Sequence, residues 1–176
     1  MTDLSTPPGP AATATTIVSD ASSLGSLALI DYLWLLESIY GTVAIAEGVA
    51  STLALAKNAR IQAVLSVPWV RVQAPSEGEI AQILAQGQQL ELGETHTLAL
   101  ALQLQANELL TNERRARQVA QALDLSVIGI FGLIIVAKQR QLIPSVRRVI
   151  DTLVEQAGFR VSNRLYQQIL KFADEI

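Results

Sequence analysis

Short apolar segments alternate with helical stretches along nearly the whole chain, and this alternation constrains the fold more than any other feature. The segments expected to be extended are residues 17–18, 42–45, 69–72, 108–111 and 127–128. The spacing of apolar residues predicts helices over residues 21–36, 47–55, 59–65, 77–89, 114–123, 129–140, 146–157 and 162–172, with one more after Gly93. Strands that alternate with helices in one short domain form a parallel sheet covered on both faces. We therefore expect an α/β fold with a mainly parallel central sheet.

Carboxylates follow two of the extended segments directly. Asp20 comes after Ile17-Val18-Ser19, and Glu113 comes after Leu109-Leu110-Thr111-Asn112. In a parallel sheet the crevice outside the carboxyl ends of the strands binds ligands, so we expect Asp20 and Glu113 to face one crevice. Asp20 also suits the N-cap of the following helix, and Asn112 with Glu113 could cap the helix that begins at Arg114. The two roles are compatible, because helices begin at this edge of the sheet.

The composition restricts the chemistry that such a crevice could support. The chain has 176 residues, of which 50% are hydrophobic and 16% charged, enough for the core of one domain. It has no cysteine and one histidine, which excludes disulfides, thiolate chemistry and a multi-histidine zinc centre. Carboxylates and water remain as metal ligands, and they suit magnesium or manganese. The net charge of −3 argues against a general attraction of the surface to nucleic acid.

The beginning of the chain and its most apolar window bear on location. Residues 1–15 are rich in threonine, alanine and proline and have neither a basic start nor an apolar run. We expect a disordered leader there and a single domain over residues 16–176. The most apolar window, residues 127–137, has about 11 residues, against the ~20 needed to span a bilayer. We therefore expect a cytoplasmic protein without a membrane segment.

Several motifs, taken in order, resemble the PIN-domain superfamily, and more narrowly its prokaryotic branch of predicted nucleic-acid-binding proteins. They are Val18-Ser19-Asp20-Ala21-Ser22-Ser23-Leu24, Leu92-Gly93-Glu94, Leu109-Leu110-Thr111-Asn112-Glu113-Arg114, Arg117-Gln118-Val119-Ala120, Gly129-Ile130-Phe131-Gly132-Leu133 and Gly158-Phe159-Arg160-Val161-Ser162. No single motif is specific, but their ordered combination is. The resemblance covers about residues 17–175, and it implies a three-layer α/β/α sandwich.

The resemblance also implies a function and its site residues. It implies an endoribonuclease in which three or four carboxylates hold one or two Mg²⁺ or Mn²⁺ ions, with the toxin of a toxin–antitoxin pair as one role and a protein antitoxin and single-stranded RNA as partners. By position, the catalytic and metal-binding residues are Asp20, Glu94 and Glu113. The residues that would orient them are Ser22, Thr111 and Asn112.

Several of these residues also have an ordinary structural explanation. Glu94, with Glu91, could simply be an acid in the first turn of a helix, where it stabilises the helix dipole. Arg114 and Arg117 could bind phosphates, yet an ordinary solvated helix face explains them equally well. For His96 we expect solvent exposure.

Two positions depart from the family pattern. Where the second helix of the family usually carries a glutamate, this chain has Thr52, and where the branch usually has two aspartates it has Asn112 and Glu113. Glu47 is unsuited to replace the missing acid, because five residues of helix leave the two side chains about 140° apart. Fewer carboxylates attract a divalent cation less strongly. Three interpretations remain open: a weakened nuclease, a non-catalytic module that binds RNA or a protein partner, and a structural subunit of an oligomer.

Apolar residues also predict self-association. The stretch from Leu24 to Leu36 carries apolar residues on more than one helical face, so we expect a homodimer that buries the surplus. Trp34, Trp69 and Tyr166 lie in apolar surroundings, and we expect them to be core or interface anchors rather than platforms for stacked bases.

Overall fold

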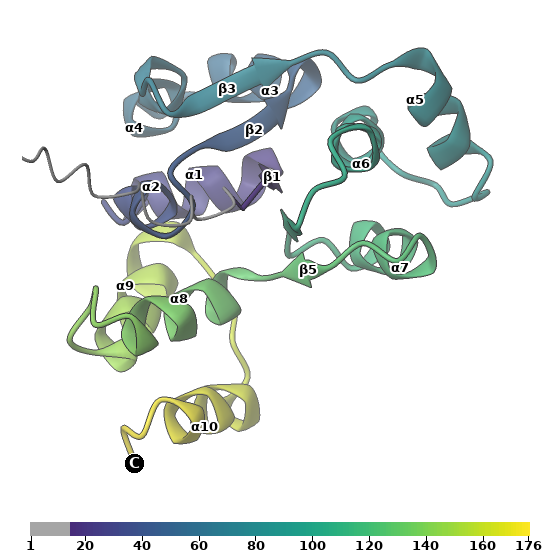
Figure 1. Cartoon of the computed structure of the whole chain (residues 1–176). Helices are drawn as coiled ribbons and strands as arrows, with labels where there is room; N and C mark the ends of the chain where they lie inside the picture. The colour runs from purple at the N-terminus through teal and green to yellow at the C-terminus, as the bar shows by residue number, and fades with distance from the viewer. Residues whose placement is uncertain (1–14) are drawn as a thin grey trace, which may run out of the picture.

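The structure, a computed structural model, describes residues 15–176 and has a parallel sheet at its centre (Figure 1). The strands are β1 (Ile17–Ser19), β2 (Val43–Ala46), β3 (Val70–Gln73), β4 (Glu108–Leu110) and β5 (Val127–Ile128). They pair in the order β3-β2-β1-β4-β5, and every pair is parallel. The predicted parallel sheet is confirmed. All but the last residue of the expected leader, residues 1–15, lies outside the described residues.

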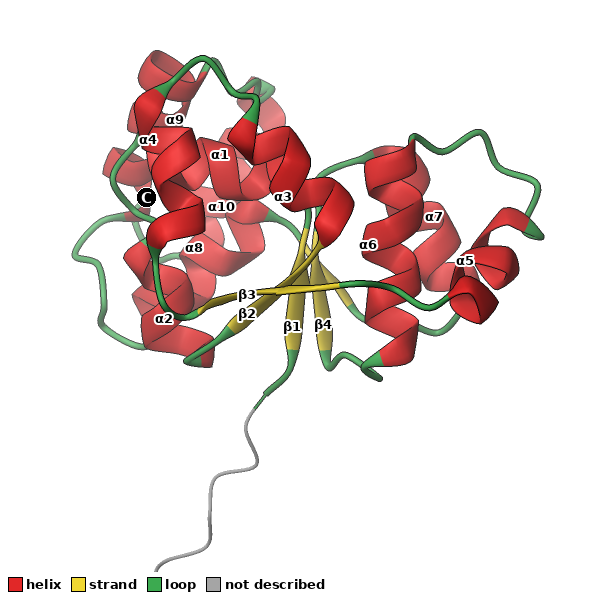
Figure 2. Ribbon diagram, turned by 90° about the horizontal axis from the view of Figure 1, so that it is seen from above, coloured by secondary structure: helices red, strands yellow, loops and turns green. Residues whose placement is uncertain are grey.

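Helices cover both faces of the sheet. They are α1 (Ala21–Leu29), α2 (Trp34–Tyr40), α3 (Glu47–Ala54), α4 (Ala59–Gln62), the short 3₁₀ helix η1 (Ala63–Ser66), α5 (Glu77–Leu84), α6 (Leu92–Gln103), α7 (Arg114–Ala122), α8 (Ile130–Gln139), α9 (Val146–Ala157) and α10 (Asn163–Phe172). Helices α5, α6 and α7 lie on one side of the sheet, and α1, α3, α4, α8, α9 and α10 lie on the other (Figure 2). The fold is the expected three-layer α/β/α sandwich.

Two predicted helices are shorter than their apolar spacing indicated. The helix expected over residues 21–36 is divided into α1 and α2, because Asp31 adopts a left-handed conformation with φ 60°. The N–H groups of Asp31 and Tyr32 then turn back to the carbonyls of Ala28 and Leu27, which ends α1 in a Schellman motif. The helix expected over residues 77–89 ends at Leu84, ahead of another positive φ in the following loop.

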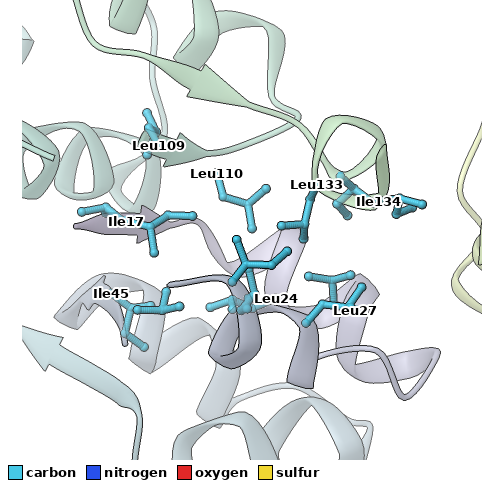
Figure 3. Close-up of a cluster of buried hydrophobic side chains, with 14 of the residues drawn as sticks. Ile17, Leu24, Leu27, Ile45, Leu109, Leu110, Leu133 and Ile134 are labelled. Carbon is cyan, nitrogen blue, oxygen red and sulfur yellow. The ribbon is translucent and has the colours of Figure 1, made fainter. Parts of the chain in front are cut away.

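The core surrounds the central strand β1 and its neighbour β2. Every residue of β1 and β2 is buried. Leu24 and Leu27 of α1 and Leu133 of α8 gather beside Leu110 of β4, as Figure 3 shows. The pairing of β1 with β4 continues one residue beyond β1, since the N–H of Asp20 donates to the carbonyl of Leu110 at 3.1 Å. The backbone at Asp20 is therefore tied to the sheet by this hydrogen bond.

The strand order places a crevice beside Asp20. The chain passes from β1 to β2 and β3 toward one edge of the sheet, and β4 and β5 then extend it on the other side of β1. In open α/β sheets, ligands bind outside the carboxyl ends of the strands at such a reversal. Asp20 follows β1 and Glu113 follows β4, so both lie at this switch point.

The three aromatic anchors have different surroundings. Trp69 is buried in the core, whereas Trp34 is 41% exposed, so its predicted role at an interface stays a prediction. Tyr166 is half-buried and donates to the carboxylate of Asp151 at 2.7 Å.

None of the helices between residues 15 and 176 has the length and apolar character needed to cross a membrane.

Candidate functional site

A pocket of about 510 Å³ opens at the switch point of the sheet. It lies between the N-terminal ends of α1 and α6, helix α3 and the residue that precedes α7. Asp20, Glu94 and Glu113, the three acids predicted to form the site, all line it, together with Glu91. Among the described residues that line the pocket, none is basic. The pocket is therefore strongly negative and suits a cation.

Asp20 is buried and uses only one of its carboxylate oxygens. It is the N-cap of α1, as one interpretation of the sequence predicted, because Oδ1 accepts from the N–H of Ser23 at 2.8 Å. Oδ2 is buried, and no hydrogen bond of ordinary geometry reaches it from residues 15–176. A buried oxygen without a partner is costly and calls for a ligand or a proton.

The pKa of Asp20 reflects the same conflict. Burial raises the pKa, because it disfavours the charged carboxylate. The hydroxyls of Thr111 and Ser23 and the backbone N–H groups of Ser23 and Asn112 lower it, because they stabilise the charge. Burial prevails, so the carboxylate is held in an environment that favours its neutralisation.

Glu113 lies exposed at the mouth of the pocket. Its backbone N–H donates to the Thr111 hydroxyl oxygen at 3.1 Å, but its side chain makes no capping hydrogen bond to α7, contrary to the predicted cap. Desolvation raises the pKa of Glu113, and the negative charges of Asp20, Glu94 and Glu91 raise it further. The four carboxylates therefore repel one another across one pocket.

Glu94 serves the start of α6 as well as lining the pocket. Its Oε2 accepts from the backbone N–H of Glu91 at 2.8 Å, as in a capping box. The interpretation of Glu94 as a helix-start acid is therefore confirmed in part. Glu91, the N-cap residue, lines the pocket too, although the sequence motifs did not assign it to the site. The spacing of three residues from Glu94 at one helix start was the signal for it.

Asn112 joins three elements through its side-chain amide. Its Nδ2 donates to the Ser23 hydroxyl oxygen at 3.2 Å, and its Oδ1 accepts from the N–H of Ile130, at the start of α8, at 3.1 Å. A Cβ atom at Gly129 would stand 2.9 Å from that Oδ1 and 2.9 Å from a guanidinium nitrogen of Arg117. Asn112 therefore caps α8 rather than α7, and it does not line the pocket.

The wall formed by α3 offers no carboxylate. Thr52 lines the pocket and is exposed, and its hydroxyl donates to the carbonyl of Gly48 within the same helix at 3.0 Å. Glu47 does not line the pocket, as its position about 140° around the helix from Thr52 predicted. Ser22, another predicted site residue, is exposed and lines the pocket from α1.

The prediction that His96 is solvent-exposed was wrong. The ring is half-buried, and its Nδ1 is buried without a partner among residues 15–176. The cause is tertiary, because α3 packs against α6 so closely that a Cβ at Gly48 would stand 3.2 Å from this nitrogen. His96 does not line the pocket.

The two arginines expected to bind phosphate differ in their burial and in their hydrogen bonds. Arg117 is half-buried, and its Nη1 donates to the carbonyl of Thr111 at 3.3 Å. Arg114 is exposed and makes no hydrogen bond or ion pair within residues 15–176. Arg114 is therefore the better placed of the two to meet an external phosphate.

The donor set fits a hard divalent cation in chemistry. The pocket presents carboxylate oxygens, which Mg²⁺ and Mn²⁺ prefer, and the partnerless Oδ2 of Asp20 is the buried atom that such a cation would satisfy. Within residues 15–176, however, no group of three or more acidic or histidine side chains is already arranged to hold a metal ion. Binding would therefore require the carboxylates of Glu94 and Glu113 to move toward Asp20.

The comparison with known proteins agrees with this architecture. A family model described as a PIN domain matches residues 16–175. A search of the curated proteins finds no match. Because the family model spans nearly all of the described chain, the chain belongs to the PIN-domain family.

Proposed function

We propose that the protein is an endoribonuclease of the PIN type that depends on Mg²⁺ or Mn²⁺ and cleaves single-stranded RNA. One observation carries the proposal: a carboxylate oxygen of Asp20 is buried without a partner in a pocket lined by three further acids. Such a site repels anions and attracts a cation, and the bound cation could in turn contact a phosphate.

Each residue has a role in this proposal. Asp20, Glu94 and Glu113 would hold the cation, and Glu91 would add a fourth negative charge on the α6 side. A bound Mg²⁺ or Mn²⁺ would supply Lewis-acid activation of a water and would neutralise charge at the scissile phosphate. Thr111 holds the backbone of Glu113 through its hydroxyl oxygen. Arg114 would meet a phosphate beside the pocket.

The remaining wall of the pocket supports a nucleic-acid substrate. Apolar side chains from α1, α3, α4 and the loop between α3 and α4 also line the pocket; they are Leu29, Val49, Leu53, Ala56 and Ile61. An ion and its water shell need no such wall. A nucleotide has an anionic phosphate and a flat base, and it would use both halves of the pocket.

A non-catalytic module that binds RNA or a protein partner is the second candidate. It is favoured by Thr52, which offers a hydroxyl where the family usually has a glutamate. It is also favoured because no three acids within residues 15–176 are already arranged to hold a metal ion. In this case the fold and its pocket would be retained without hydrolysis.

Calorimetric titration with Mn²⁺ separates the two candidates. The nuclease proposal expects the wild-type protein to bind Mn²⁺ and to cleave single-stranded RNA only when Mn²⁺ is present. Asp20→Asn should abolish both, since it removes the buried charge yet keeps a good N-cap residue. Wild-type protein that stays folded and binds no Mn²⁺ would favour the non-catalytic module.

We propose a homodimer, supported by the exposed Trp34, and a toxin role with a protein antitoxin as partner. We also propose a cytoplasmic location. Sedimentation at tens of micromolar tests the dimer, because a monomer at that concentration would contradict both the dimer and the interpretation as a structural subunit.

A further inference from the structure

We infer that Asn112 is a positioning residue for Asp20: its amide group donates to Ser23, which leaves the hydrogen of the Ser23 hydroxyl for the Asp20 carboxylate. This inference rests on the proposed function, in which Asp20 holds the cation. It explains why an amide, and not a carboxylate, stands at position 112.

The geometry around Ser23 decides where its hydrogen goes. Ser23 is fully buried, so its hydroxyl has no water to bond. The oxygen accepts from the Nδ2 of Asn112 at 3.2 Å, and a hydroxyl has only one hydrogen to donate. That hydrogen must therefore turn away from Asn112. The carboxylate of Asp20 is the neighbouring acceptor, and its Oδ1 already bonds the backbone N–H of Ser23 at 2.8 Å.

Thr111, the residue after β4, repeats the arrangement. Its hydroxyl oxygen accepts from the backbone N–H of Glu113 at 3.1 Å, which leaves its hydrogen free as well. Both hydroxyls lower the pKa of Asp20 against the effect of burial. Residues 112 and 113 thus leave the hydrogens of two buried hydroxyls free to turn toward a carboxylate whose Oδ2 has no partner among residues 15–176.

An aspartate at position 112 would undo half of this arrangement. It could still accept from the N–H of Ile130, so the cap of α8 would survive. It could not donate to Ser23, and the Ser23 hydroxyl would then turn its hydrogen to position 112 and away from Asp20. The side chain has no room to avoid this, because the backbone at Gly129 approaches it closely.

Nuclear magnetic resonance tests the hydrogen bonds without any metal. In wild-type protein the side-chain NH₂ of Asn112 should exchange slowly with water, and Ser23→Ala should speed that exchange. The carboxyl carbon-13 shift of Asp20 should change in Asn112→Ala and in Ser23→Ala. Asn107→Ala is the matched control, because the Asn107 side chain accepts from Thr16 N–H at 2.7 Å before β4, at the far end of the strand. It should leave the Asp20 shift unchanged.

Mn²⁺ affinity tests the consequence through a double-mutant cycle. Asn112→Ala and Ser23→Ala should each weaken Mn²⁺ binding by roughly tenfold, the lower end for a residue that orients a metal ligand. The double variant should be no weaker than the weaker single variant, because both changes remove the same donor from Asp20. Asn107→Ala should bind Mn²⁺ as the wild type does.

The outcomes separate this inference from the proposed function. Independent effects that multiply in the double variant, or an unchanged Asp20 shift in Asn112→Ala, would overturn the positioning role. An Asn112→Ala variant that lowers the unfolding midpoint but leaves the Asp20 shift and Mn²⁺ affinity unchanged would also overturn the positioning role. Wild-type protein that binds no Mn²⁺ while the Asp20 shift responds as expected would refute the proposed function and leave the hydroxyl arrangement standing.

Discussion

Replacement of Thr52 by glutamate would restore a carboxylate on the α3 wall of the pocket. The position is exposed, and the change removes a hydroxyl hydrogen bond to the carbonyl of Gly48 within the helix. Glutamate forms helices at least as well as threonine does, so the free energy of unfolding should change by less than about 0.5 kcal/mol. Any effect on metal binding would then come from the new charge and not from a change in folding.

The expected gain in affinity follows from Coulomb's law. Two unit charges ~4 Å apart attract by about 1 kcal/mol in water, so a divalent cation and a carboxylate attract by about 2 kcal/mol. This free energy corresponds to about thirtyfold tighter binding of Mn²⁺. Calorimetry measures the affinity, and cleavage of single-stranded RNA at limiting Mn²⁺ should rise with it.

The neutral variant Thr52→Gln is the matched control. It has the size and helix propensity of glutamate without the charge, and it should bind Mn²⁺ as the wild type does. Asp20→Asn combined with Thr52→Glu should lose the gain, because the new acid cannot replace the buried one. If Thr52→Glu and Thr52→Gln bind Mn²⁺ equally, the missing acid is not the limiting defect and the reasoning fails.

Three further predictions concern stability. Burial raises the pKa of Asp20 above its ordinary value of 3.8. The metal-free protein therefore loses stability as the pH rises through the pKa that Asp20 has in the folded state. Asp20→Asn should remove that loss and raise the urea midpoint at pH 7. Burial acts to raise the pKa of Glu175, but hydrogen bonds from the start of α9 lower it overall. Glu175→Gln should therefore lower the free energy of unfolding by about 1–3 kcal/mol at pH 7. Urea titrations should show this difference shrinking below about pH 4. Gly129→Ala should lower the thermal midpoint, since its Cβ would stand 2.9 Å from the Asn112 side chain; an unchanged midpoint would show that the loop relaxes freely.

The order of strands and helices was predictable because apolar spacing is a local property. The strand at residues 127–128 and the helix at residues 146–157 match their predicted bounds. The division of the helix predicted over residues 21–36 was not predictable in this way. Asp31 adopts a positive φ there, and an aspartate carries a weaker signal for that conformation than a glycine does.

The gathering of the acids was predictable only in part. The carboxyl edge of a parallel sheet brings together residues that follow neighbouring strands, which placed Asp20 and Glu113 in one pocket. The surroundings of His96 and the inclusion of Glu91 depend on how α6 packs against α3 and on where the loop before α6 runs. The contact around His96 is tertiary, and no spacing along the chain reports it, whereas the three-residue spacing from Glu94 was a local signal for Glu91.

Capping and ligand binding use the same side-chain atoms, which is why sequence patterns did not separate them at this site. Asp20 caps α1 with one oxygen and has a second, buried oxygen without a partner. Asn112 uses both its amide nitrogen and its oxygen in hydrogen bonds to neighbouring elements. A capping residue is free to bind a ligand only with the atoms that its structural role leaves unused. By that criterion we propose Asp20 as a ligand-binding residue of the pocket and Asn112 as a residue that orients it.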